Sequence, residues 1–231
     1  MRTAAVVPAA GRGERLGPGA PKALRELGGV PILVHAVRAL ARARSVDIVV
    51  VAAPPDEVDA VSALLIDQQI DAEVDVVAGG STRQSSVARA VASLAADVDV
   101  VLVHDAARPL VPVELVDAVA AAVRAGADAV IPVLPVADTI KQVDSDAVVA
   151  TLDRSVLRAV QTPQGFRRAV LVQAHAAGDG ADATDDAGLV EAIGVVVRTV
   201  VGSAEAFKVT RPIDLLLAEA LLAQRRAAGV R

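Results

Sequence analysis

The stretch from Thr3 to Leu24 reads TAAVVPAAGRGERLGPGAPKAL. It begins with a short aliphatic run over residues 4–7, which predicts a buried strand. The strand leads into a glycine-rich loop that carries Arg12, Arg15 and Lys22. Glycine lets backbone N–H groups approach phosphate oxygens closely, and fixed cations neutralise the phosphate charge. The stretch therefore predicts a polyphosphate site at the end of the first strand.

Two common phosphate-binding loops do not fit this stretch. A P-loop needs a second glycine five positions after the first, but Leu16 and Pro18 stand there after Gly11 and Gly13. The dinucleotide fingerprint also fails, because its third glycine position is Leu16 and the next strand ends without an acid for a ribose hydroxyl. The remaining alternative is an ordinary glycine-rich turn with solvated arginines. The cluster of cations in an acidic protein favours phosphate over that alternative.

Length and composition indicate one soluble α/β domain over residues 1–231. The chain is 54% hydrophobic, has a net charge of −5, and contains two Phe but neither Trp nor Tyr. It therefore lacks both the basic surface and the stacking platform that nucleic-acid binding normally needs. The absence of cysteine is compatible with the cytoplasm. The N-terminal apolar run is broken by Pro8, so we expect neither a secretory signal nor a membrane helix.

Predicted strands and helices alternate along most of the chain. The predicted strands cover residues 4–7, 46–52, 73–78, 99–104 and 129–133, and the helices between them cover 31–44, 55–69, 79–94 and 112–125. A β-hairpin follows over 139–143 and 147–152, and then come helices over 166–177, 184–193 and 212–227 and strands over 195–201 and 206–209. This order predicts a mostly parallel sheet covered by helices, with the hairpin projecting from it.

Ligands of such sheets lie at the carboxyl ends of the strands, so the residues after each strand carry the functional prediction. The fourth strand ends in His104-Asp105-Ala106-Ala107-Arg108-Pro109, where Asp105 is placed to hold Mg²⁺ and Arg108 to bind an anion. Alternatively, Asp105 caps the turn and pairs with Arg108. The three histidines, His35, His104 and His175, form no ligand pair and are interpreted as structural.

Three further segments allow both a structural and a functional interpretation. In Gly79-Gly80-Ser81-Thr82-Arg83-Gln84-Ser85-Ser86, Ser81 or Thr82 suits a helix N-cap, whereas Ser86 and backbone groups suit recognition of a base. Lys208, in a short apolar strand, slightly favours function. In Thr184-Asp185-Asp186, a cap followed by acids at the positive end of a helix favours structure.

Nine motifs in this order resemble 2-C-methyl-D-erythritol 4-phosphate cytidylyltransferases of the non-mevalonate isoprenoid pathway. The motifs are PAAGRGERLG, PKAL, GGSTRQSSV, VHDAARP, DTIK, LDR, QTPQGF, TDDAG and FKVTRP. The resemblance implies a Rossmann-like nucleotidyltransferase fold whose β-arm, residues 136–154, crosses to the partner in a homodimer. It also implies the transfer of CMP from CTP to 2-C-methyl-D-erythritol 4-phosphate with release of pyrophosphate, assisted by Mg²⁺ or another divalent cation.

The resemblance also implies a role for each matching residue. The nucleotide site would comprise Pro8, Ala9, Ala10, Gly11, Gly13, Arg15, Lys22, Gly79, Gly80, Ser86, Asp105 and Lys208. The sugar phosphate would meet Asp105, Ala106, Arg108, Thr139, Arg154, Thr162, Thr184 and Lys208, with Thr139 and Arg154 coming from the other subunit. Catalysis would depend on Arg15, Lys22 and Lys208, and the metal would bind Asp105.

Chemistry agrees with these roles, because a phosphate monoester is already anionic at neutral pH and attacks without a general base. Three alternatives remain at this point. A ribitol 5-phosphate cytidylyltransferase would share the first loop, and the Ala106-Ala107 pair is the feature that argues against it. An NAD-dependent oxidoreductase would need the missing fingerprint. A noncatalytic nucleotide sensor would have no reason to combine Lys22, Asp105 and Lys208.

Overall fold

The computed structural model describes residues 1–11, 22–70, 72–178 and 184–229. Its centre is an 8-stranded sheet with the order β10-β7-β11-β6-β1-β4-β5, in which β12 pairs with β7. The strands are β1 (Arg2–Pro8), β4 (Ile48–Ala53), β5 (Val74–Ala78), β6 (Val98–Val103), β7 (Ala129–Pro135), β10 (Arg158–Val160), β11 (Gln164–Arg167) and β12 (Val197–Val201). The β1–β4, β1–β6, β4–β5 and β7–β12 pairs are parallel, whereas β10 and β11 run antiparallel to their neighbours. The predicted mostly parallel sheet is confirmed.

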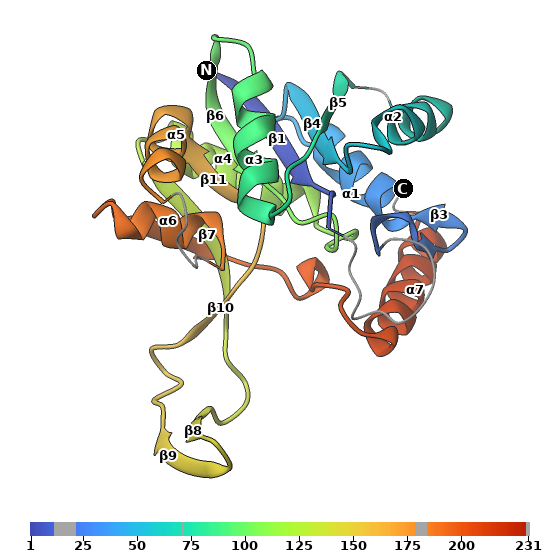
Figure 1. The fold of residues 1–231 in the computed structure, drawn as a ribbon. Coiled ribbons are helices and arrows are strands. Elements are labelled where there is room, and N and C mark those ends of the chain that lie inside the picture. The colour runs from blue at the N-terminus through green and yellow to red at the C-terminus, as the bar shows by residue number, and fades with distance from the viewer. Residues whose placement is uncertain (12–21, 71, 179–183, 230–231) are drawn as a thin grey trace.

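Helices cover both faces of this sheet (Figure 1). One face packs against α1 (Ile32–Ala41), α2 (Val58–Asp67) and α4 (Val113–Arg124). The other packs against α3 (Arg83–Ser93), α5 (Arg168–Ala177) and α6 (Asp186–Ala192). The sheet thus separates two apolar cores, as in other doubly covered parallel sheets.

The aliphatic run in β1 contributes to both cores. Ala5 and Val7 face the α1, α2 and α4 side, whereas Ala4 and Val6 face the α3, α5 and α6 side. All four are fully buried, because side chains alternate between the faces of a strand and both faces are covered here. The position of β1 between β4 and β6 brings residues 9–11, which follow it, to the carboxyl edge of the sheet's interior.

The last helix, α7 (Pro212–Ala227), has the bounds that the sequence predicts. It packs through a third apolar cluster against a small hairpin, β2 (Glu26–Leu27) and β3 (Val30–Pro31). In the described part of the chain, no helix has the length and apolar character needed to span a membrane.

A two-stranded arm, β8 (Lys141–Asp144) and β9 (Ala147–Thr151), projects away from the body (Figure 1). The two strands are antiparallel and pair only with each other among the described residues. The predicted hairpin is therefore confirmed. The arm exposes several large apolar side chains, including Val143, Val148 and Val149.

Two predicted elements are wrong. The helix predicted over 166–177 begins only at Arg168, because Phe166 lies in strand β11 between β6 and β7, where its side chain is completely buried. The strand predicted over 206–209 is replaced by a short 3-10 helix, η3 (Ala204–Ala206), and an irregular segment that holds Lys208. That segment is tied to the body by the Val209 N–H, which donates to the carbonyl of Ala107 at 2.8 Å, rather than by a strand ladder.

Candidate functional site

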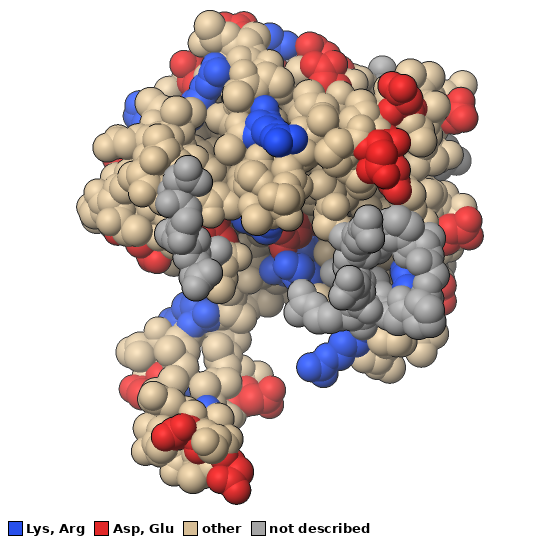
Figure 2. Space-filling model, in the orientation of Figure 1, with Lys and Arg blue, Asp and Glu red and all other residues tan. Residues whose placement is uncertain are grey.

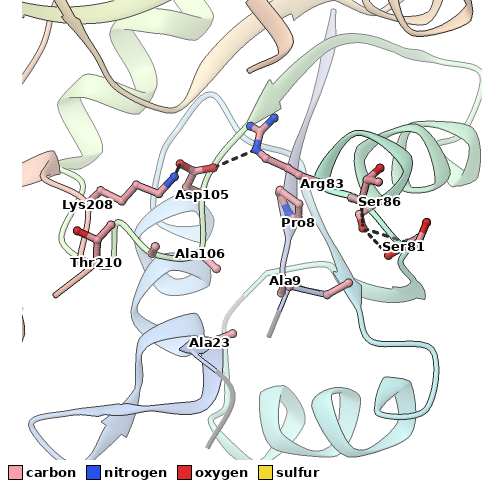
Figure 3. Close-up of a pocket in the computed structure, with 15 residues that line it drawn as sticks. Pro8, Ala9, Ala23, Ser81, Arg83, Ser86, Asp105, Ala106, Lys208 and Thr210 are labelled. Carbon is pink, nitrogen blue, oxygen red and sulfur yellow. Dashed lines mark hydrogen bonds and ion pairs between the residues drawn. The ribbon is translucent and has the colours of Figure 1, made fainter. Parts of the chain in front are cut away.

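A cavity of about 290 Å³ opens where β1, β5 and β6 end (Figure 3). Each of these strands is followed by a loop, and the segment around Lys208 closes the remaining side. The lining residues are Pro8, Ala9, Ala10, Gly11, Ala23, Gly80, Ser81, Thr82, Arg83, Ser86, Asp105, Ala106, Ala107, Lys208 and Thr210. The cavity therefore lies at the carboxyl edge of the sheet, where ligands of open α/β sheets bind.

The loop after β5 is held in shape by its own side chains. Thr82 is the N-cap of α3 and accepts a hydrogen bond from the Ser85 N–H at 3.0 Å, which confirms one of the two predicted caps. Ser86 is buried, and its hydroxyl accepts from the Gly80 N–H at 3.0 Å and donates to the Thr82 carbonyl at 2.8 Å. The Ser86 hydroxyl thus fixes the backbone that lines the cavity.

Gly79 allows two loops of the site to approach each other. A Cβ at this position would lie 2.7 Å from the Cβ of Ala10 and 3.0 Å from the Ser86 Oγ. Any larger side chain would therefore push the loop after β5 away from the loop after β1. The absence of a side chain at Gly79 sets the width of the cavity at this end.

Asp105 lies among three cations directly after β6. Its Oδ2 is 2.8 Å from Lys208 Nζ and 3.8 Å from Arg108 Nε, and its Oδ1 is 3.3 Å from Arg83 Nε. Burial alone would raise the pKa of Asp105, but Arg83, Lys208 and Arg108 together hold it well below its usual range. Asp105 is therefore ionised at neutral pH. The predicted turn is present as well, since the Arg108 N–H donates to the Asp105 carbonyl.

A second cavity, of about 220 Å³, lies on the other side of Asp105. It is lined by Arg83, Asp105, Arg108, Val160, Gln161, Thr162, Gln164, Thr184, Asp185 and Lys208. The two cavities share Arg83, Asp105 and Lys208, which form a common wall. Figure 2 shows acidic and basic side chains close together in the hollow between the body and the arm.

His104 supports the second cavity through its hydrogen bond with Thr162, one of the lining residues. It is fully buried, and burial lowers its pKa to about 4, so the ring is neutral at pH 7. Its Nε2 lies 3.1 Å from the Arg108 carbonyl, which can only accept, so Nε2 carries the proton. Its unprotonated Nδ1 accepts a hydrogen bond from Thr162 Oγ1 at 3.1 Å, and the same hydroxyl oxygen accepts from the Asp105 N–H at 3.1 Å. His104 thus has the structural role that the sequence predicts.

Arg108 is held largely by backbone carbonyls. Its guanidinium donates to Ala206 O at 2.7 Å and to Val160 O at 3.3 Å. Its Nε is buried without a hydrogen-bond partner among the described residues and faces Asp105. The guanidinium therefore contributes its charge to the second cavity from a fixed position.

Sequence reasoning missed Arg83 and the role of Asp186. Arg83 NH1 lies 2.7 Å from Asp186 Oδ2, and His175 Nε2 lies 2.9 Å from Asp186 Oδ1. Burial lowers the pKa of Arg83, but the carboxylates of Asp186 and Asp105 raise it by more. Burial likewise opposes ionisation of Asp186, yet His175 and Arg83 bring its pKa below the ordinary value.

The N-cap of α6 differs from the predicted one. Asp185 rather than Thr184 accepts from the Gly188 N–H.

The structure brings most predicted site residues together, in two groups. Those in the first cavity are Pro8, Ala9, Ala10, Gly11, Gly80, Ser86, Asp105, Ala106 and Lys208, with Gly79 beside it, and those in the second are Asp105, Arg108, Thr162, Thr184 and Lys208. Thr139 and Arg154 are exposed on the projecting segment and line neither cavity. Gly13 and Arg15 lie outside the described residues, as does the side chain of Lys22, whose backbone begins the short helix η2 (Lys22–Leu24).

Comparison with known proteins gives a consistent result. The family model described as IspD: 2-C-methyl-D-erythritol 4-phosphate cytidylyltransferase matches residues 3–224. Curated proteins with that name are 59% identical in Streptomyces coelicolor, over 97% of this chain and 86% of the relative, and 64% identical in Frankia casuarinae, over 96% and 82%. The crystal structure of the cytidylyltransferase from Thermus thermophilus has a TM-score of 0.77 at 39% identity, covering 96% of this chain and 100% of that one. The 4-diphosphocytidyl-2C-methyl-D-erythritol synthase from Anaerococcus prevotii has a TM-score of 0.83 at 27% identity, covering 96% and 98%.

Proposed function

This chain belongs to the 2-C-methyl-D-erythritol 4-phosphate cytidylyltransferase family, and on that basis we propose how its two cavities perform the transfer. The reaction transfers CMP from CTP to methylerythritol phosphate and gives 4-diphosphocytidyl-2-C-methyl-D-erythritol and pyrophosphate. CTP occupies the cavity at the ends of β1 and β5, and the polyol phosphate occupies the second cavity.

The observation that carries this proposal is the wall shared by the two cavities. Arg83, Asp105 and Lys208 line both of them. In the transfer, a phosphate oxygen of the polyol bonds to the α-phosphorus of CTP while the bond from that phosphorus to the β-phosphate oxygen breaks. The two reacting phosphates must therefore meet at the boundary between the two substrates, where these charged groups lie.

The mechanism depends on positioning and electrostatics. The acceptor phosphate is anionic at neutral pH, so no residue needs to remove a proton from it. Negative charge increases on the α-phosphate oxygens and on the departing pyrophosphate, which leaves with the bonding electron pair. We assign stabilisation of that charge to Arg15, Lys22 and Lys208. Support comes from the position of Lys208 at the wall and from the place of η2 directly after the glycine-rich loop.

Recognition of the cytosine base is assigned to the backbone around Ala9, Ala10 and Gly80 and to Ser86. These residues line the first cavity, and the loop that carries Gly80 is fixed by the Ser86 hydroxyl. A rigid backbone offers donors and acceptors in fixed places, which suits discrimination between base edges. The described part of this cavity contains no aromatic side chain, so hydrogen bonds rather than stacking have to provide the selectivity.

The acceptor site is assigned to Ala106, Arg108, Thr162 and Thr184, together with Asp105 and Lys208. Support comes from the second cavity, where a fixed guanidinium and two hydroxyl-bearing side chains surround a space next to the wall. Arginine and lysine bind phosphate, and threonine hydroxyls pair with polyol hydroxyls.

We assign a magnesium ion to Asp105 as part of this proposal. The described residues include no group of three or more His, Asp or Glu that could hold a metal on its own. Mg²⁺, however, usually binds one or two carboxylates together with waters and substrate phosphate oxygens. The ionised Asp105 supplies such a carboxylate, and a bound ion would take the place of Lys208 at Oδ2. When bound there, the ion would supply charge neutralisation at the phosphates.

We also propose a homodimer in which the arms are exchanged, so that Thr139 and Arg154 complete the partner's acceptor site. The arm is supported in this role by its exposed apolar residues Val143, Val148 and Val149, each more than half exposed in the single chain. An apolar surface of this kind on a thin two-stranded element favours a contact with another chain. Because CTP is an intracellular nucleotide, we place the enzyme in the cytoplasm.

The match of the family model and the names of the relatives favour methylerythritol phosphate over ribitol 5-phosphate as the acceptor. They equally disfavour an oxidoreductase and a noncatalytic sensor. The test is a pyrophosphate-release assay with CTP and a panel of polyol phosphates. We expect the highest kcat/KM with methylerythritol phosphate, and a higher kcat/KM with ribitol 5-phosphate would contradict the proposal.

A further inference from the structure

Asp186 is a buried carboxylate that the proposed mechanism does not use. It is the first residue of α6 and is completely buried. Its two oxygens have separate partners, since Oδ1 lies 2.9 Å from His175 Nε2 and Oδ2 lies 2.7 Å from Arg83 NH1. A buried carboxylate without partners costs free energy of folding. Asp186 therefore holds Arg83 and His175 firmly. Asp186 therefore fixes the position of Arg83.

Arg83 connects this buried carboxylate to the reaction site. It is the first residue of α3, and it lines both cavities. Figure 3 shows Arg83 and Lys208 on opposite sides of Asp105. The contact of Arg83 with Asp186 is shorter than its 3.3 Å contact with Asp105, and the Asp186 side chain is 1% exposed against 11% for Asp105. Asp186 is thus the stronger of the two anchors.

The guanidinium of Arg83 retains capacity to bind an anion. Its contacts with the two carboxylates use the Nε–H and one N–H of NH1. Guanidinium has five N–H donors, and no hydrogen bond between described residues uses the other three. The side chain is 31% exposed and lines both cavities. A planar donor array of this kind suits phosphate oxygens.

The two anchors of Arg83 differ once substrates bind. Asp105 lies in the open wall, where incoming phosphates compete with its carboxylate for the cations around it. Asp186 lies behind Arg83, away from that competition and already paired with His175. Arg83 consequently keeps its position while the surroundings of Asp105 change. A charge that does not move during the reaction is the kind that stabilises a transition state most effectively.

We propose that Arg83 contacts the transferring phosphate and that Asp186, supported by His175, is the residue that positions Arg83. This inference rests on the proposed cytidylyl transfer. As the new P–O bond forms and pyrophosphate leaves with the electron pair, charge accumulates on the non-bridging oxygens at the boundary of the two cavities. Arg83 lies at that boundary and stabilises this charge together with Lys208.

A double-mutant cycle on turnover tests the proposal. Arg83→Lys keeps the charge but loses the planar donors, and we expect kcat to fall on the order of 10²-fold, as for loss of one transition-state donor. The dissociation constant of CTP from calorimetry should change by less than about threefold, because the contact strengthens only in the transition state. Asp186→Asn should lower kcat about tenfold by loosening Arg83. The variant with both substitutions should be no slower than Arg83→Lys alone, because Asp186 acts through Arg83.

Asp117→Asn is the matched control, because Asp117 is a carboxylate of α4 that accepts hydrogen bonds from the Ser45 N–H and Oγ at 2.9 and 2.6 Å and lines neither cavity. It should leave kcat unchanged even if thermal stability falls. If Asp186→Asn does not fold, His175→Leu removes one of the two partners of Asp186 and should lower kcat a few-fold, again without a further loss in the Arg83→Lys background.

Three outcomes would overturn the inference, each for a different reason. Wild-type turnover with an equally active Arg83→Lys variant would exclude contact with the transferring phosphate. Losses that multiply in the doubly substituted variant would show that Asp186 acts independently of Arg83. A wild-type protein that forms no cytidylyl product would overturn the proposed function itself, and the role of Arg83 with it.

Discussion

Lys208 Nζ lies 2.8 Å from Asp105 Oδ2, and this ion pair stands in the wall that separates the two cavities. The ion pair connects two segments more than a hundred positions apart in the sequence. Because both partners line both cavities, any change in the pair reaches both of them.

Substitution of Lys208 by Met should therefore affect both substrates. Asp105 loses its nearest cation, and the reacting phosphates lose one positive group at their boundary. We expect kcat to fall on the order of 10²-fold, with KM raised for CTP and for the polyol phosphate. Steady-state kinetics with each substrate varied in turn measures this. A change in KM for one substrate alone would contradict the shared wall.

Substitution of Lys22 by Ala should lower turnover far more than it weakens CTP binding. Its ammonium is expected to act where charge develops, and no base shares the catalytic work. The expected loss in kcat is on the order of 10²–10³-fold. Calorimetry with CTP gives the binding term for comparison, and equal losses in binding and turnover would rule out a role in the transition state.

The enzyme should prefer CTP to UTP. Backbone groups around Ala9, Ala10 and Gly80 and the Ser86 site are expected to match the edge of cytosine. Uracil would leave such buried groups unpaired, which typically costs about 1–3 kcal/mol for each group. Comparison of kcat/KM for the two nucleotides measures the preference. Similar values would show that the base is not read by these groups.

His104 should make folding stability depend on pH. The pKa of His104 is 6.5 in the unfolded reference and about 4 in the folded protein, so the unfolded chain binds more protons between these values. The contribution of His104 to the free energy of unfolding is complete above pH 6.5. It decreases as the pH falls toward 4, by about 3 kcal/mol in total. Denaturant titrations of the wild type and His104→Gln from pH 4 to 7 test this. In the variant, the free energy of unfolding should depend less steeply on pH over this range. Parallel curves of unfolding free energy against pH for the two proteins would contradict the prediction.

Exchange of the arms should allow two inactive variants to restore activity together. A mixed dimer of Lys22→Ala and Arg154→Ala chains would collect both defects in one site and leave the other site intact. Random reassortment makes about half of the dimers mixed, so about a quarter of wild-type activity should return after the two proteins are refolded together. Mixed dimers without activity would mean that each site is built from one chain.

The arm could also be a flap that belongs to its own chain. In the structure, Arg154 donates to the Ala137 carbonyl, and Asp153 accepts from the Ser155 N–H at 2.9 Å. A self-contained flap predicts an Arg154 that is either solvated or paired with Asp153; here Arg154 is exposed, donates within the arm and is not paired with Asp153. The mixing experiment separates the two interpretations because only an exchanged arm restores an intact site.

The sequence predicts the elements whose patterns are local. Helix α7 has the predicted bounds because Pro212 suits its first turn, and strand β1 follows from an unbroken aliphatic run. Strand β11 was missed because only its pairing with β6 and β7 makes Phe166 part of the sheet, and four residues carry no period of their own. Tertiary pairing overrides local preference at that position.

In the site, too, residues with a local sequence pattern can be predicted and contacts made by tertiary packing cannot. Asp105 was predicted from its place directly after an apolar strand, and Lys208 from its place in a short apolar segment before a helix, although that segment is not a strand. The pair of Arg83 and Asp186 is not predictable, because the two residues are 103 positions apart and each resembles an ordinary helix-terminal charge. Their spacing along the chain contains no signal for a contact, and only the packing of α3 against α5 and α6 creates it.

The shared wall has a consequence for redesigning the enzyme to accept other alcohols. Replacement of Arg83, Asp105 or Lys208 would damage nucleotide use together with acceptor use, so these positions offer no independent control of the acceptor. Residues that border only the second cavity and hold no group of the wall, such as Val160, Gln161 and Thr184, can be varied while the lining of the first cavity is kept. Thr162 is not among them, because its hydroxyl accepts from the Asp105 N–H. A library restricted to those three positions would explore new polyol phosphates on a constant first cavity.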